Sequence, residues 1–231
     1  MPSFIFDLET TGLDIGNDKI TEIALLNVET NRLLTKLVNP QRPLSEGAMK
    51  VTGKSFMDYE KEKPFSYVAD EIIDFIGTDS PVYIIGHNVD NFDKPFLEKE
   101  LRLVKKKIPK PWKFIDTLKI AREILPELES HSQESLRKFF NVSETNSHAA
   151  AKDVMDLQLI FQNFTMEYSL PKLHHISKCY NRWPCFEYRG RLIRDVPLWY
   201  LKKMKQQEFF EKNPDVLCML KRSCHPELSL I

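Results

Sequence analysis

Two carboxylates stand at the end of the first apolar segment of the chain. Asp7 and Glu9 lie in the segment 3–9, whose aromatic and β-branched residues predict a strand. Residues two apart on a strand point to the same face, so the two acids project together. Carboxylates held this close repel each other unless protons or a cation intervene. An Asp-x-Glu pair taken alone, however, is usually a solvated strand end.

Two more acids and a histidine occur where helices are expected to begin. Asp93 follows an apolar strand expected over 81–85 and lies near the start of a helix expected over 92–104. His148 precedes, and Asp153 lies within, a helix expected over 149–164. Taken one at a time, these residues read as a helix cap, a loop histidine and a partly buried acid. A buried acid without a partner is costly, which favours a cation or a partner side chain near Asp153.

The three clusters form ordered motifs. They read Phe-Asp-Leu-Glu-Thr-Thr-Gly-Leu at 6–13, Gly-His-Asn-Val-Asp-Asn-Phe-Asp at 86–93, and His-Ala-Ala-Ala-Lys-Asp at 148–153. The sequence resembles the DEDD exonuclease superfamily, in the DEDDh branch whose last motif has a histidine five residues before the final aspartate. That branch includes the epsilon proofreading subunit of bacterial DNA polymerase III and exonuclease X. The resemblance spans roughly residues 3–165.

This resemblance implies a catalytic site. Asp7, Glu9, Asp93 and Asp153 would hold two divalent cations, Mg²⁺ or Mn²⁺, as oxygen-only ligands favour. His148 would deprotonate the attacking water, a task suited to its near-neutral pKa. The implied reaction is hydrolysis from a 3′ end that releases nucleoside 5′-monophosphates.

The resemblance also implies a pocket for the terminal nucleotide. Thr10 and Leu13 would contact that nucleotide, with Leu13 as an apolar surface against the base. Asn88 and Phe92 would line the same pocket. The implied partner is nucleic acid with a single-stranded 3′ end.

The order of elements predicts an α/β fold, a ribonuclease H-like mixed sheet flanked by helices. Its domain would cover residues 1–168. Strands are expected at 3–9, 19–28, 31–38, 81–85 and 114–116, and helices at 65–76, 92–104, 117–125, 132–140 and 149–164.

The remaining residues, 171–231, are expected to form a small basic α+β module. Residues 188–191 look like a hairpin turn, and 195–197 open a helix. The segment resembles the C-terminal module of exonuclease X-like proteins and favours DNA over RNA. Its aromatic residues predict a small core for the module or stacking platforms for bases, and Arg189 and Arg191 are the candidates for nucleic-acid contact.

Composition adds a charge asymmetry to this division. The whole chain has 33 basic and 33 acidic residues. Residues 1–167 carry 21 Lys and Arg against 27 Asp and Glu, and residues 168–231 carry 12 against 6. A basic tail fits phosphate contact, although two solvated faces would show the same pattern. The run 105–107 is either a solvated loop or a guide for the substrate strand.

The expected location of the protein and the redox state of its cysteines follow from the lack of a long apolar run and of a secretory signal in the sequence. No apolar run reaches membrane-spanning length and no secretory signal is evident, so a cytoplasmic protein is expected, without a membrane partner. The four cysteines, Cys179, Cys185, Cys218 and Cys224, are expected to be reduced. Their spacing is wider than that of common zinc sites, which leaves zinc as a minor alternative.

Three other functions stay open at this stage. An exoribonuclease would use the same five residues. An inactive exonuclease fold could serve as a binding module, although none of the five residues is missing. The third is an endonuclease or a domain in a larger repair assembly; an endonuclease would differ in cutting substrates whose 3′ end is blocked.

Overall fold

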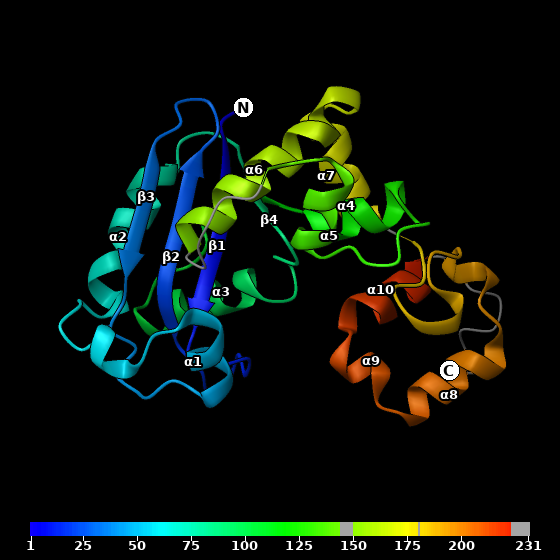
Figure 1. Ribbon diagram of the computed structural model, residues 1–231, viewed down its shortest axis with the longest axis horizontal. Helices are drawn as coiled ribbons and strands as arrows, with labels where there is room; N and C mark the ends of the chain where they lie inside the picture. The colour runs from blue at the N-terminus through cyan, green and yellow to red at the C-terminus, as the bar shows by residue number, and fades with distance from the viewer. Residues whose placement is uncertain (144–149, 180, 223–231) are drawn as a thin grey trace.

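A single mixed sheet organises the protein. The computed structural model describes residues 1–143, 150–179 and 181–222. The sheet has five strands in the order β3-β2-β1-β4-β5 (Figure 1). The strands β1 (Ser3–Thr10), β2 (Ile20–Asn27) and β3 (Leu33–Leu37) form an antiparallel meander, and β4 (Val82–Gly86) and β5 (Trp112–Asp116) extend the sheet parallel to β1. The expected ribonuclease H-like sheet is confirmed.

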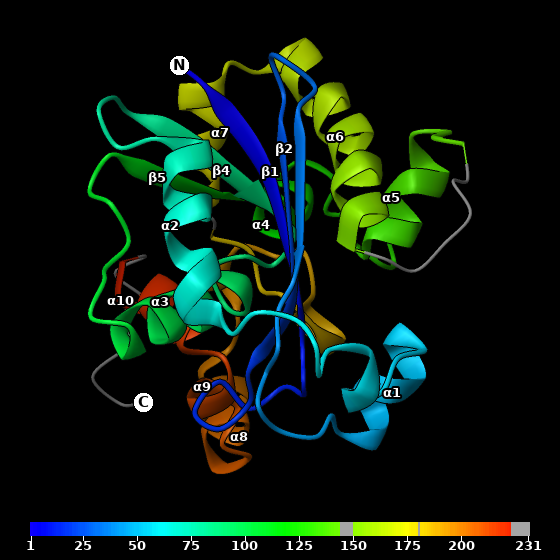
Figure 2. The same cartoon turned by 90° about the vertical axis from the view of Figure 1, so that its left-hand side faces the viewer.

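Helices cover both faces of this sheet (Figure 2). α2 (Phe65–Ile76) and α3 (Asp93–Leu103) pack on one face. α4 (Thr117–Ile124), α5 (Gln133–Phe139), α6 (Ala150–Glu167) and α7 (Leu170–Cys179) form the other layer. A short helix, α1 (Glu46–Thr52), lies beyond the end of β1 and closes on the left-handed Gly53.

The central strand β1 contributes side chains to both layers. Phe4, Phe6 and Leu8 belong to the core shared with α2 and α3, and Ile5 belongs to the core shared with α6. Because successive side chains on a strand alternate, Asp7 and Glu9 lie on the Ile5 face. The strand therefore presents its two carboxylates to the face that α6 covers.

α7 extends this layer beyond the expected domain end at 168. Its Leu173 is fully buried in the same core as α6, and the backbone N–H of Asp116 donates to Ser177 Oγ at 2.9 Å. A separate core first appears at Trp183. The change in packing thus follows α7, later than the change in composition near residue 170.

The described residues after α7 are mainly helical. They include α8 (Leu198–Gln206), α9 (Phe209–Lys212), α10 (Pro214–Arg222) and single 3₁₀ turns at Phe186–Tyr188 and Ile193–Asp195. The expected α+β character is reduced to one antiparallel bridge, between Arg182 and Leu192. The chain does reverse at Gly190, but a 3₁₀ turn follows Leu192 directly, so no strand pairing can extend from the bridge.

The core of this part uses the aromatic residues unevenly. Trp183 and Tyr200 are fully buried, with their rings 5.7 Å apart. Phe186 and Trp199, in contrast, are exposed. Within the described residues, no helix is both long and apolar enough to span a bilayer.

Candidate active site

Three carboxylates meet at the end of β1. Asp7 and Glu9 from β1 and Asp153 from the first turn of α6 each offer an oxygen, and these oxygens all lie within 4.8 Å of one another. β1 supplies the first two through its alternation, and the packing of α6 on the same face supplies the third. Three carboxylate oxygens at this spacing are a donor set that suits Mg²⁺ or Mn²⁺.

Asp93 joins this group from the opposite layer. It is the first residue of α3, is 3% exposed, and accepts a hydrogen bond from the Leu8 backbone N–H at 3.1 Å. β4 pairs with β1 only as far as Ile5, so the Leu8 N–H lies beyond that pairing. The Asp93 carboxylate therefore accepts from a backbone N–H at the open edge of β1, a contact that neither the helix-cap interpretation nor the predicted metal-binding role had included. Asp7, Glu9, Asp93 and Asp153 are called the acidic cluster below.

Mutual repulsion and burial make the acidic cluster a poor place for four negative charges. Burial, followed by repulsion from Asp93 and Asp153, raises the pKa of Asp7 well above its usual value. Burial, with Asp153 and Glu22, raises the pKa of Glu9 to about 7. Burial also raises the pKa of Asp93 to about 7. A divalent cation would offset this repulsion, so the residues fit a metal-binding site.

A further acid lies beside the cluster and was missed in the sequence. Glu22 on β2 stands opposite Glu9 in the strand register and is 5% exposed. Like charges directly opposite each other destabilise a sheet. An ion pair between Lys54 and Glu22, at 2.8 Å, offsets the repulsion between Glu22 and Glu9. Only the β1–β2 register could have revealed this contact.

Asp116 fixes the loop that carries the second motif. Its carboxylate accepts hydrogen bonds from the backbone N–H groups of Asn88 at 3.1 Å and Asp90 at 3.3 Å, while also capping α4. Gly86 permits the sharp turn, because a Cβ there would lie 2.8 Å from Val89 Cβ. The loop is thus held by its backbone at the carboxyl edge of the sheet.

A partly buried ion-pair group stabilises the same loop from α4 and α7. Asp90 contacts Lys119 at 3.0 Å and Lys178 at 2.7 Å. Burial raises the pKa of Asp90, but the two lysines outweigh it and hold that pKa below its usual range. Next to it, burial lowers the pKa of His87 to about 4, so this imidazole is neutral near pH 7.

The residues expected to contact the terminal nucleotide fall into two groups. Leu13 is 82% exposed at the tip of the turn after β1, as an apolar surface for a base requires. Thr10 is buried, and its hydroxyl donates to the Gly12 carbonyl at 2.7 Å, which shapes that turn. Asn88 and Phe92 are half-buried in the segment before α3, where Phe92 directly precedes Asp93, and the Phe92 ring packs against Phe96.

The two predicted arginine contacts occupy different places. Arg189 and Asn88 line one cavity of about 430 Å³ between the sheet domain and the helical C-terminal part. We call this cavity the module cleft; its lining also includes His87, Arg122, Glu129, His131 and Ser132. Arg191 lies outside the cleft lining, with its guanidinium over the Tyr188 ring.

Two expectations fall wholly or partly outside the described residues. His148 lies outside them, and so does Cys224. Cys179, Cys185 and Cys218 are free thiols. Among the residues that the structure describes, the acidic group formed by Asp7, Glu9 and Asp153 is the set with metal-ligand spacing, and no cysteine belongs to it.

Comparison with known proteins supports the reading of the motifs. The model of the exonuclease family matches residues 4–161. A DNA polymerase III of PolC type from Bacillus subtilis is 36% identical over 159 residues, which cover 64% of this chain and 10% of the polymerase. A 3′-5′ exonuclease, DinG, from the same organism is 28% identical over 161 residues, covering 68% of this chain and 17% of that protein.

Two further comparisons cover more of the chain. Exonuclease DPD1 of Arabidopsis thaliana is 28% identical over 195 residues, covering 76% of this chain and 60% of that protein. E. coli exonuclease I, in a complex with single-stranded DNA, superposes with a TM-score of 0.65 at 18% identity, covering 75% of this chain and 42% of that one. The match to the family model spans well over half of the sequence and includes β1, α3 and the start of α6. The chain belongs to the exonuclease family.

Proposed function

We propose that this protein is a divalent-cation-dependent 3′-5′ exonuclease that acts on DNA and releases nucleoside 5′-monophosphates. The observation that carries the proposal is the convergence of three carboxylate oxygens, within 4.8 Å of one another, at the end of β1. The family match supports phosphodiester hydrolysis, and the polymerase names among the relatives support DNA as the substrate.

The chain's own residues would divide the work. Asp7, Glu9 and Asp153 would hold one cation, and Asp93 would help Asp7 to hold a second. Bound cations of this kind stabilise the charge on the attacking and leaving oxygens of an in-line displacement at phosphorus.

Positioning and proton transfer would fall to other side chains. Leu13 would support the terminal base, and Asn88 would line the path of the strand. His148 would accept a proton from the attacking water, as its place in the third motif indicates. Water would add to phosphorus as the bond to the 3′ oxygen of the preceding nucleotide breaks, so the terminal nucleotide leaves with the phosphate.

The decisive experiment is a digestion series. Single-stranded DNA, double-stranded DNA and RNA, each labelled at the 5′ end, would be incubated with Mg²⁺ or with EDTA. We expect a ladder that shortens from the 3′ end in DNA with Mg²⁺ only, and mononucleotides with a 5′-phosphate. Full-rate degradation in EDTA would exclude the metal-dependent mechanism. Cutting of a 3′-blocked strand would point to an endonuclease, and preference for RNA to an exoribonuclease.

A further inference from the structure

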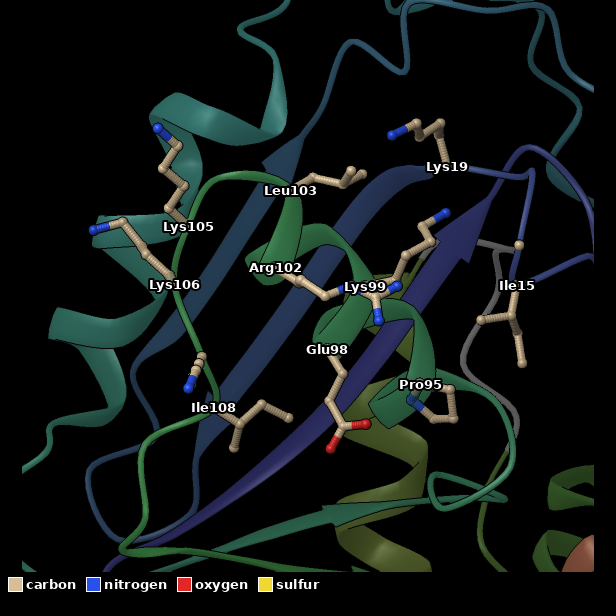
Figure 3. Close-up of a pocket in the computed structure, with 12 residues that line it drawn as sticks. Ile15, Lys19, Pro95, Glu98, Lys99, Arg102, Leu103, Lys105, Lys106 and Ile108 are labelled. Atoms are coloured by element: carbon tan, nitrogen blue, oxygen red, sulfur yellow. The ribbon is translucent and has the colours of Figure 1, made fainter.

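A basic cavity of about 940 Å³ runs along one side of α3 (Figure 3). Ile15 and Pro95 lie toward one end of it, and Lys105 and Lys106 toward the other. Its walls are α3, the loop between β1 and β2, and the segment that follows α3. We call this cavity the α3 groove.

The lining of the α3 groove is rich in cations. Six basic side chains line it against a single carboxylate, Glu98; the six are Lys19, Lys99, Arg102, Lys105, Lys106 and Lys107. Glu98 lies 3.7 Å from Lys94, a residue outside the lining. The groove therefore presents a net positive surface.

Half of these cations have acidic partners in the fold. Lys19 and Lys99 contact Glu100 at 3.2 and 3.1 Å, and Lys106 contacts Asp70 at 2.6 Å. Lys19 and Lys99 share the single carboxylate of Glu100, so two negative charges offset most of these three positive charges, which therefore contribute less than unpaired cations to attraction of an outside anion.

The other three cations have no acidic partner among the described residues. Arg102, Lys105 and Lys107 are all exposed. Lys105 is held at φ 59°, a left-handed conformation in the turn that ends α3, so the backbone fixes the position of this part of the wall. Three unbalanced cations on one wall favour a ligand with several regularly spaced negative charges.

The groove begins close to the acidic cluster. α3 starts at Asp93, within the cluster, and its 11 residues rise about 1.5 Å each, so its far end lies about 16 Å away. On the other wall, Ile15 and Gly16 follow Leu13 within two or three residues. A chain with its 3′ end at the acidic cluster can therefore enter the groove directly.

We propose that the α3 groove binds the phosphodiester backbone of the substrate on the 5′ side of the scissile bond. This inference rests on the proposed exonuclease function. Arg102, Lys105 and Lys107 contact phosphates along the wall that α3 and the segment after it form. Contacts to phosphate carry no information on base or sugar, so the groove holds DNA and RNA alike.

The test compares two triple variants of equal charge. The groove variant carries Arg102→Gln, Lys105→Asn and Lys107→Gln, with asparagine chosen because it tolerates the left-handed conformation. The control carries Lys61→Gln, Lys63→Gln and Lys172→Gln, which are exposed and outside the groove lining. Binding is measured by fluorescence anisotropy of single strands of about 16 nucleotides, a common length for such sites. All proteins also carry Asp7→Asn to prevent digestion.

We expect the groove variant to lose affinity and salt dependence together. The slope of log K against log salt should become shallower by about 0.7 per lost contact, or about 2 for three contacts. If the contribution vanishes near about 1 M salt, Kd at about 0.1 M rises about 100-fold, equally for DNA and RNA. An unchanged Kd and slope, matching the control, would overturn the proposal and leave an acidic protein segment as the occupant to test.

A second readout separates this proposal from the proposed function. With Asp7 restored, both triple variants are assayed on the p-nitrophenyl ester of thymidine 5′-monophosphate, which is too short to reach the groove. We expect the same kcat/KM for both. A loss confined to the groove variant would place its residues at the acidic cluster and contradict the proposal. If the unaltered protein cleaves neither ester nor strand, the exonuclease function fails, while the anisotropy result still decides whether the groove binds nucleic acid.

Discussion

The acidic cluster lies at the start of α3 and the α3 groove runs along the side of the same helix, but the two regions carry charge of opposite sign and differ in burial. The acids are buried or half-buried and lie so close together that the pKa of Asp7 is raised by its three neighbours as well as by burial. The unbalanced cations of the groove are exposed and follow one another along a wall. Electrostatic interactions are strong where water is excluded and weak where water and salt screen them.

This difference determines how each region fails. The acidic cluster acts as a unit, because each carboxylate changes the protonation of the others. In the groove the contributions to binding affinity add, because each exposed cation attracts a polyanion separately. A single substitution should therefore abolish the work of the first region and only weaken that of the second.

The largest effect is expected from Asp7→Asn. This change removes the carboxylate at the centre of the cluster, so no measurable release of mononucleotides should remain. The fold should survive, and in EDTA the Tm should be no lower than that of the unaltered protein, because a repelled buried charge is gone. Circular dichroism and thermal melting check the fold. Asp74→Asn, on the exposed side of α2, is the control; equal activity in the two variants would contradict the assignment.

His148→Ala should have the next largest effect. Loss of a general base lowers kcat on the order of 10²–10⁴-fold, with little change in KM. The rate should also lose its dependence on pH near neutrality. Steady-state digestion of single-stranded DNA, repeated across a pH series, measures kcat, KM and the pH dependence of the rate. His175→Ala serves as the matched control, since that histidine is exposed on α7. A rate within a few-fold of the unaltered protein would mean that another group takes the proton.

Arg189→Gln tests whether the comparison extends to the module cleft. Arg189 is exposed there, so it should behave like a groove cation and not like a member of the acidic cluster. Loss of one charged hydrogen bond, worth about 1.5–3 kcal/mol, predicts a rise in KM of about tenfold or more at unchanged kcat. Arg191→Gln, outside the cleft lining, should change neither constant. Steady-state digestion of single-stranded DNA gives both, and a fall in kcat for Arg189→Gln would place this residue in the chemistry instead.

A different kind of effect is a pH dependence of stability in protein freed of cations. Glu9 and Asp93 have a pKa of about 7 in the folded state, against usual values of about 4 for unfolded carboxylates. Between these values the folded state binds more protons, so the free energy of unfolding falls as pH rises from about 4 to about 7. The lowered pKa of Asp90 acts only at lower pH, where its contribution is lost as pH falls.

Thermal melting in EDTA across this range checks the sign. Each kcal/mol lost should lower Tm by about 2–4 °C, and Mg²⁺ added near pH 8 should restore it. A Tm that rises steadily from pH 4 to 7, or that does not change when Mg²⁺ is added near pH 8, would contradict the electrostatic account of the acidic cluster.

Local patterns in the sequence predicted much of this arrangement. The alternation in β1 placed Asp7 and Glu9 on one face, and the helix expected over 65–76 coincides with α2. The motif order predicted that Asp153 would join the first two acids, as it does. The first two features depend on period-two and helical spacing, which can be recognised within a few residues, whereas the third was implied by the resemblance of the ordered motifs to a known family.

Apart from the meeting of Asp153 with Asp7 and Glu9, the contacts between distant segments were not predicted. The Glu22–Lys54 pair depends on strand register, and the bond from Leu8 to Asp93 depends on how far β4 extends along β1. The helical character of the C-terminal part could not be foreseen either, since a chain reversal at Gly190 reads in sequence like a hairpin. Such features follow from packing of whole elements, which no local pattern encodes.

The attachment of α7 has a consequence for how the protein is made. The family segment ends at residue 161, yet Ser177 accepts the Asp116 N–H and Lys178 pairs with Asp90. During synthesis, the loop that carries the second motif therefore gains its contacts with α7 only after residues 177 and 178 have left the ribosome. A fragment cut to the length of the family segment would leave Asp90 short of one of its two lysines, so the unit to express is one that continues through residue 179.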